Sequence, residues 1–279
     1  MREDSSLANI QVLAIDLDGT LLDSQSCVSK QNGAALDLAK SAGLTIVLAT
    51  GKPYAAIAEH VHSYSLHNPH IVLGGGLIVQ ATDETVLWQQ GLLSAEAVRI
   101  IEGLSQLQMP FVVYYQKHSA VLSDFSMSGR IAHLIDIGEP SPLVCSVMTS
   151  EETAYKVLTF THVEETEQDV AVRAMASEDT QVIRTSPYLL EFIPRHGGKH
   201  IALEQLAQQK GITLANIAAF GDSENDRDML HAAGWSVVMG NASQSLQAIA
   251  NWVVADNDNH GVAEAIMRIV QAQKQGGLL

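Results

Sequence analysis

Two aspartates separated by one residue, Asp16 and Asp18, are the residues whose types and spacing most clearly suggest chemistry. They follow the apolar run Val12-Leu13-Ala14-Ile15 and precede Gly19 and Thr20. Two carboxylates this close repel each other, so a cation between them would be favourable, and Mg²⁺ prefers oxygen ligands of this kind. The alternative is a strand that ends in a solvated Asx turn without a chemical role.

The residues around this pair predict where it lies in the fold. An uninterrupted apolar run such as Val12 to Ile15 is typical of a short buried strand. Gly19 suggests that the backbone turns directly after the strand. Ligands of open α/β sheets bind at the carboxyl ends of the strands. We therefore expect both acids at such an edge.

Further polar groups follow other predicted strands or begin a predicted helix. Each group alone has an ordinary interpretation, because a Thr-Gly pair after a strand is usually a turn and a single lysine is usually solvated. Together they would supply oxygen ligands for Mg²⁺ and hydrogen-bond donors for phosphate oxygens at one rim. They are Thr50, Gly51 and Lys52; Lys199; and Asp222, Asn225 and Asp226.

The overall composition narrows the class of protein. The chain has 279 residues, 47% of them hydrophobic, which suffices for a large core or two domains. Its formal net charge of -15 disfavours nucleic acid and anionic membrane surfaces as partners. No apolar run approaches membrane-spanning length, and Cys27 and Cys145 form no disulfide or zinc pattern. We expect a cytoplasmic protein.

The order of predicted elements indicates an inserted domain. Up to about residue 78, strands alternate with helices, which is the pattern of a parallel sheet with right-handed crossovers. From 79 to 189 the strands look paired and the turns short, and the first pattern resumes afterwards. We predict an α/β fold: a Rossmann-like parallel-sheet core domain over 1-78 and 190-279, and an inserted α/β domain over 79-189. The apolar stretch Leu189 to Ile193 could close the insert or begin the return.

In motif order and spacing, nearly the whole chain resembles a haloacid-dehalogenase-like hydrolase of the Cof-type branch. These are phosphatases with a large α/β cap, which the insert would form. The resemblance is specific in Asp16-Leu17-Asp18-Gly19-Thr20 and in Gly221-Asp222-Ser223-Glu224-Asn225-Asp226, and looser in the insert.

This resemblance implies a role for each polar residue. Asp16 would be the nucleophile that forms an aspartyl-phosphate, and Asp18 the general acid and base. Mg²⁺ would be held by Asp16, the backbone carbonyl of Asp18, and Asp222, with Asp226 supporting these ligands. Lys199 would also be catalytic, because it screens negative charge. The phosphoryl group would be bound by Thr50, Lys199, Asn225 and the backbone N–H groups of Leu17 and Gly51.

Two residues depart from the pattern of the family. Most relatives have arginine at the position of Lys52, where it helps to bind the substrate, and asparagine at the position of Gly74. A lysine offers a point charge in place of a bidentate fork. Both departures concern substrate recognition, since neither touches the nucleophile or the metal ligands.

The leading hypothesis is a Mg²⁺-dependent phosphatase that acts on small phosphorylated metabolites, such as sugar phosphates. A phosphomutase of the same fold is one alternative, because it would also use an aspartyl-phosphate. A ligand-sensing module with low turnover is another, suggested by Lys52 and Gly74. The insert carries no motif that identifies the substrate, and none indicates an oligomeric state.

Overall fold

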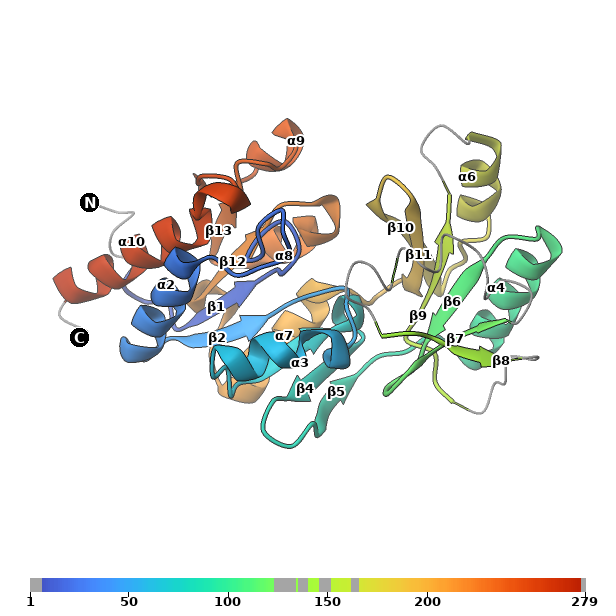
Figure 1. The fold of residues 1–279 in the computed structure, drawn as a ribbon, viewed down its shortest axis with the longest axis horizontal. Coiled ribbons are helices and arrows are strands. Elements are labelled where there is room, and N and C mark those ends of the chain that lie inside the picture. The colour runs from blue at the N-terminus through green and yellow to red at the C-terminus, as the bar shows by residue number, and fades with distance from the viewer. Residues whose placement is uncertain (1–6, 123–133, 135–139, 146–151, 162–165, 277–279) are drawn as a thin grey trace.

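The computed structural model describes residues 7–122, 134, 140–145, 152–161 and 166–276. The described residues form two lobes, and the first and last of them lie on the first lobe (Figure 1). The first lobe contains the beginning and the end of the chain, and the second contains the middle. Among the described residues, no helix is both long and apolar enough to cross a bilayer.

The first lobe is built on a parallel sheet in the order β14-β13-β12-β1-β2. Its strands are short and mostly buried because helices cover both faces, as the predicted parallel sheet requires. The strands are β1 (Val12–Ile15), β2 (Thr45–Leu48), β12 (Ile217–Gly221), β13 (Trp235–Val238) and β14 (Trp252–Val253).

Alternate residues of β1 point to opposite faces of this sheet. Leu13 and Ile15 pack into a cluster with α2 (Lys30–Ser41), α3 (Tyr54–Ser63) and α10 (Gly261–Gln275). Val12 and Ala14 belong to a second apolar cluster on the other face. The helices of that face are α7 (Lys199–Lys210), α8 (Arg227–Ala232) and α9 (Gln244–Gln247).

A small antiparallel sheet, β3-β4-β5, extends the first lobe. A parallel bridge between Ala49 and Ile71 joins it to the end of β2. Ile78 of β4 and Trp88 of β5 pack into the same cluster as α7. β4 and β5 therefore form a hairpin that packs on the first lobe. Its strands are β3 (Pro69–Val72), β4 (Leu77–Gln80) and β5 (Val86–Gln89).

The second lobe is a sheet in the order β10-β11-β9-β6-β7-β8, antiparallel except between β7 and β8. An apolar cluster joins α4 (Ser94–Gln106) and α6 (Thr166–Arg173) to one face of this sheet. The strands are β6 (Phe111–Tyr114), β7 (Ser119–Leu122), β8 (Leu143–Cys145), β9 (Lys156–Phe160), β10 (Thr180–Ser186) and β11 (Leu189–Pro194).

The expected domain boundaries, 78/79 and 189/190, fall inside β4 and β11. β4 pairs with β3 and β5 on the first lobe, whereas β11 pairs with β9 and β10 in the second. Of the two alternatives for Leu189 to Ile193, the strand thus closes the insert. We propose that the insert spans about 90–195. Both lobes contain strands and helices, so apolar runs in the sequence do not by themselves mark where the chain passes from one lobe to the other.

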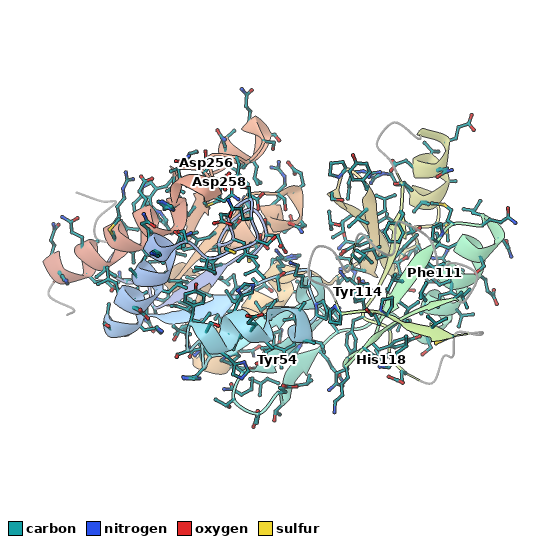
Figure 2. All side chains as sticks on the ribbon, viewed as in Figure 1. Tyr54, Phe111, Tyr114, His118, Asp256 and Asp258 are labelled. Carbon is teal, nitrogen blue, oxygen red and sulfur yellow. The ribbon has the colours of Figure 1, made fainter. Side chains whose placement is uncertain are left out.

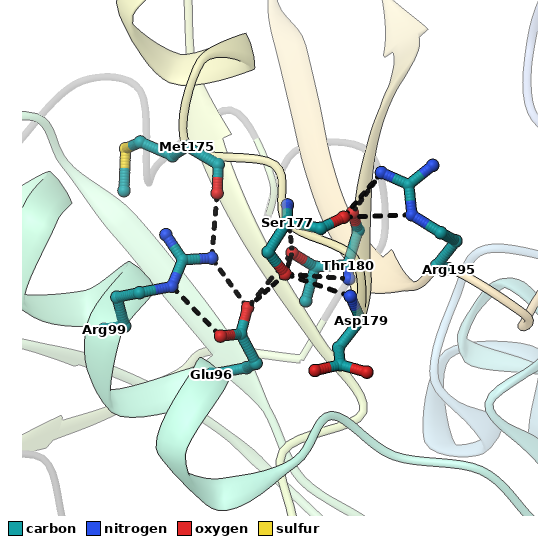
Figure 3. A network of polar contacts seen from close by, with 7 residues as sticks. All are labelled: Glu96, Arg99, Met175, Ser177, Asp179, Thr180 and Arg195. Carbon is teal, nitrogen blue, oxygen red and sulfur yellow. Dashed lines mark hydrogen bonds and ion pairs between the residues drawn. The ribbon is translucent and has the colours of Figure 1, made fainter.

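A polar network holds the chain where it leaves the second lobe (Figure 3). The Arg195 guanidinium donates to the backbone carbonyl of Ser177, with Nε 2.9 Å from the oxygen. The Ser177 hydroxyl donates to Glu96 at 2.6 Å, and Arg99 forms a two-pronged ion pair with the same carboxylate. These hydrogen bonds, led by that of Arg99, lower the pKa of Glu96 to about 2. The network therefore fixes the segment that follows β11, where the chain returns to the first lobe, to α4.

Candidate active site

Three polar groups meet at the carboxyl edge of the parallel sheet because their strands are neighbours. β1 lies between β2 and β12, and Asp16, Thr50 and Asp222 follow these strands at or within two residues of their ends. The backbone N–H of Asp16 donates to Phe220 O at 3.0 Å, which aligns the two neighbouring strand ends. The expected convergence at one edge is therefore present.

Asp16 is part of a buried chain of charges. The Lys199 ammonium lies 2.5 Å from Asp16 Oδ1 and 2.6 Å from Asp226 Oδ1. Lys199 is 3% exposed and Asp226 is fully buried. Burial, followed by the repulsion of Asp226, raises the pKa of Asp16 well above its ordinary value. The two carboxylates raise the pKa of Lys199 against the effect of its burial, so the lysine stays charged.

Glycines allow Lys199 to enter the site from the start of α7. Gly75 and Gly198 have φ of 98° and 128°, which side-chain-bearing residues rarely adopt. A Cβ at Gly75 would lie 2.2 Å from the carbonyl group of Gly198, so the loop after β3 passes directly against the turn before the helix. Within the glycine run 74–76, it is Gly75 that allows these two backbone segments to approach so closely.

Asp222 is held by partners from two other loops. Its Oδ1 accepts from the Thr20 hydroxyl at 3.0 Å, and its Oδ2 accepts from Asn241 Nδ2 at 3.2 Å. Burial and the Asp226 charge raise the pKa of Asp222 to about 6. A Cβ at Gly19 would lie 2.5 Å from Asp222 Oδ2, so only glycine permits this approach of the turn after β1.

The acidic cluster has the properties of a site for a hard divalent cation. Carboxylate oxygens of Asp16, Asp222 and Asp226 lie within 4.8 Å of one another, and Lys199 alone does not offset three negative charges. Both oxygens of Asp226 already accept hydrogen bonds, Oδ1 from Lys199 and Oδ2 from the backbone N–H groups of Asp222 and Ser223. Asp222 also accepts hydrogen bonds with both oxygens, but from the side chains of Thr20 and Asn241, and it is only partly buried, whereas Asp226 is fully buried. Asp16 and Asp222 are the better candidates for metal ligands for this reason, with Asp226 as the group that holds Lys199 and the loop at 222–223.

Several hydrogen-bond donors near this cluster remain available. Thr50 Oγ1 accepts from the backbone N–H of Lys52 at 3.1 Å, which leaves the hydroxyl hydrogen free for another acceptor. Within the described part of the chain, the backbone N–H groups of Leu17 and Gly51 have no acceptor. An anion at this edge would find these donors ready without rearrangement.

A pocket beside these donors lies between the two lobes. Asn225 is on its wall, and its Oδ1 accepts from the Ser223 hydroxyl at 2.5 Å, so its Nδ2 is the end left to donate to a ligand. Gly74 also lines the pocket, and a Cβ there would meet no atom within 4 Å. The departure at Gly74 therefore leaves open space in the wall. The second lobe contributes Gln181, Ile183, Glu191 and Ile193.

Lys52 does not line this pocket. Its ammonium lies 2.7 Å from Asp18 Oδ1, with Lys52 nearly buried and the Asp18 side chain half exposed. Lys52 was expected from the sequence to bind substrate, and its contact with Asp18 was not predicted. The ion pair connects the two loops that follow β1 and β2.

Three residues that contact the site, Asn241, Lys156 and Glu191, were not predicted from the sequence. Asn241, which bonds Asp222 and Gly19 O, follows β13, so the rule that selected Asp222 could have selected it too. Lys156 of the second lobe donates to Gly51 O at 2.9 Å and pairs with Glu191 at 2.8 Å. No motif marks these last two residues, because their role depends on how the lobes meet.

Comparison with known proteins found a matching family model and several similar proteins. A family model described as haloacid dehalogenase-like hydrolase matches residues 13–266. The chain is 28% identical over 296 residues to the 5-amino-6-(5-phospho-D-ribitylamino)uracil phosphatase YwtE of Bacillus subtilis, covering 95% of this chain and 99% of that one. It is 28% identical over 264 residues to the pyridoxal phosphate phosphatase YbhA of Escherichia coli, covering 92% and 97%.

Solved structures show the same architecture. A haloacid dehalogenase-like hydrolase from B. subtilis superposes with a TM-score of 0.82 at 25% identity, over 92% of this chain and 99% of that chain. YwtE and YbhA are equally similar to this chain, yet they are named for different substrates. Overall similarity therefore selects a fold and a type of reaction without selecting a metabolite.

Proposed function

Because this chain belongs to the haloacid dehalogenase-like hydrolases, in the Cof-type branch of phosphoric monoester hydrolases, we propose that it hydrolyses small phosphorylated metabolites, such as sugar phosphates, in a Mg²⁺-dependent reaction with an aspartyl-phosphate intermediate. One observation carries the proposal. The Asp16 carboxylate is buried against Lys199 at the edge of the sheet, beside N–H groups without acceptors among the described residues.

The proposed reaction has two displacements at phosphorus, and Asp16 is the nucleophile in the first. An oxygen of Asp16 attacks phosphorus while the bond to the leaving oxygen breaks, and Asp18 gives its proton to that oxygen. Water then attacks the phosphorus of the aspartyl-phosphate, Asp18 takes the proton of this water, and the bond to Asp16 breaks. Inorganic phosphate leaves and both acids return to their initial states.

The remaining residues would hold the phosphoryl group in line and offset its charge, which is most of what phosphoryl transfer requires. The Thr50 hydroxyl, Asn225 Nδ2 and the N–H groups of Leu17 and Gly51 would donate to its oxygens, and Lys199 would supply positive charge. When bound, Mg²⁺ would be held by Asp16, Asp222 and the backbone carbonyl of Asp18, and would offset negative charge on the phosphate. Asp226 would keep Lys199 and the loop at 222–223 in place.

The test of this function is a panel of phosphate monoesters. Purified protein with Mg²⁺ should release inorganic phosphate from an aryl phosphate and from some members of a set of sugar phosphates, nucleotides and phosphorylated cofactors. Chelation by EDTA should stop the release, and Mg²⁺ should restore it. A preparation of Asp16→Asn serves as the control for contaminating phosphatases. Absence of release from every compound would contradict the proposal, and formation of an isomer without release would indicate a mutase.

Lys52→Arg should change KM or the ranking of substrates, with kcat within about threefold of the wild type, because it keeps a positive charge next to Asp18. The measurement is kcat and KM for the active members of the panel. Lys40→Arg is a matched control, since the Lys40 ammonium bonds Tyr64 O away from the site. A large, uniform fall in kcat would instead mean that Lys52 acts on the transition state.

A further inference from the structure

Lys156 is a buried cation of the second lobe that the proposed mechanism does not use. It begins β9 and is 1% exposed. Its ammonium lies 2.8 Å from Glu191 Oε1 of β11 and 4.4 Å from the centre of the Tyr114 ring at the end of β6. Tyr114 is labelled in Figure 2, close to the place where the lobes meet. A lysine is rarely buried this deeply unless it is paired, and here two neighbouring strands supply its partners.

The third contact of Lys156 crosses to the first lobe. Its Nζ donates to the backbone carbonyl of Gly51 at 2.9 Å. That carbonyl belongs to the peptide group whose N–H, on Lys52, donates to Thr50 Oγ1 at 3.1 Å. Because a peptide group is planar, a donor fixed on its carbonyl also fixes the direction of its N–H. Lys156 therefore fixes the orientation of the 51–52 peptide group, both its carbonyl on Gly51 and its N–H on Lys52.

The Thr50 hydroxyl depends on this peptide. An N–H from Lys52 occupies a lone pair of Oγ1, so the hydroxyl hydrogen must point elsewhere. On the other side of the loop, Gly74 N donates to Thr50 O at 2.9 Å and holds the backbone of the threonine. A rotation of the 51–52 peptide would release the hydroxyl and also turn the adjoining backbone of Gly51.

We propose that Lys156, held by Glu191, is a positioning residue for phosphoryl transfer. Acting from the inserted lobe, it sets the peptide that aims the Thr50 hydroxyl at the phosphoryl group. The inference rests on the proposed function, because it needs a phosphoryl group at Thr50. It adds that the first-lobe loop at residues 50–52, which would bind the phosphoryl group, is oriented by the Lys156 ammonium of the second lobe.

The test removes the pair without leaving a buried charge unpaired. Lys156→Met combined with Glu191→Leu replaces the ion pair by apolar groups of similar size, an exchange that is often neutral for stability. The double variant should keep the melting temperature within a few degrees of the wild type. Its kcat for an aryl phosphate should fall about 10- to 100-fold, as expected for a misplaced catalytic donor.

Tyr155→Phe is the matched control. It removes another hydrogen bond next to Lys156, from Tyr155 Oη to Gln89 at 2.6 Å, and leaves the Gly51 carbonyl untouched. Its kcat should stay within about twofold of the wild type. If the first pair variant does not fold, Lys156→Met with Glu191→Gln makes the same test with the shape of Glu191 kept.

A further readout separates positioning from a general structural effect. In a Thr50→Val background, the added substitutions at Lys156 and Glu191 should lower kcat by a further factor of less than about three. The reason is that the hydroxyl that Lys156 would position is already absent. The full loss in that background, or a folded pair variant with wild-type kcat, would overturn the proposal. Absence of Mg²⁺-dependent turnover in the wild type would instead refute the proposed function, so the two failures are distinguishable.

Discussion

Asp16→Asn is expected to reduce turnover of every substrate by roughly 10⁴-fold or more, the scale seen when a nucleophile is removed. An amide oxygen does not attack phosphorus as a carboxylate does. The substitution keeps the shape of the side chain and an oxygen that can accept from Lys199, so the fold should survive. Steady-state rates with an aryl phosphate, together with thermal melts and binding of inorganic phosphate, measure the loss against intact folding.

The covalent step separates this mechanism from direct attack by water. If Asp16 is the nucleophile, borohydride added during turnover should convert its phosphorylated carboxylate to an alcohol, detectable by mass spectrometry at residue 16. Transfer through two displacements should retain the configuration of a chiral phosphorus, whereas one displacement inverts it. Inversion, or wild-type turnover in Asp16→Asn, would exclude Asp16 as nucleophile. Asp37→Asn, an exposed surface change, is the control for the substitution itself.

The convergence of Asp16, Thr50 and Asp222 could be predicted because it depends on local patterns alone. Buried strands end where apolar runs end, and the carboxyl ends of neighbouring parallel strands share one edge. The fold class could be predicted for the same reason, since the alternation of strands and helices reflects burial on both faces. These inferences needed no knowledge of how distant side chains pack.

Contacts between side chains from separate loops could not be predicted in this way. Lys52 was expected to bind substrate, yet its ammonium meets Asp18, which depends on the exact path of two loops. Lys156 and Glu191 lie in strands that read only as apolar segments with a charge. Their pairing against Gly51 exists because two lobes meet. Sequence periodicity predicts single helices and strands, but it does not predict which side chains of separate elements come into contact.

Asp222 should link the metal to stability as well as to activity. The pKa of Asp222 is raised to about 6 in the folded, metal-free protein, so the folded state holds this proton more tightly than the unfolded chain does. Below pH 4 both states are protonated and the group has no effect. As pH rises through about 6, the metal-free protein should lose stability from this group, by at most about 3 kcal/mol.

Asp222→Asn removes that titration and one proposed metal ligand together. Without metal, the variant should become more stable relative to the wild type as pH rises from 4 to 7, because the buried like charge is gone. With Mg²⁺ added, the wild type should gain stability by mass action while the variant gains little. At limiting Mg²⁺, activity should fall about 100-fold or more, in the range found when an electrostatic contact to the transition state is lost.

Thermal melts over this pH range, with EDTA and with Mg²⁺, measure the two effects in one experiment. Their opposite signs identify Asp222 as a ligand, since a residue that only supports the fold would lower stability in both conditions. Glu224→Gln is a suitable control, because that carboxylate lies in the same loop but pairs with Arg227. Wild-type activity of Asp222→Asn at limiting Mg²⁺ would show that the metal is held elsewhere. Equal stabilisation of both proteins by Mg²⁺ would lead to the same conclusion, because the ion would then bind without Asp222.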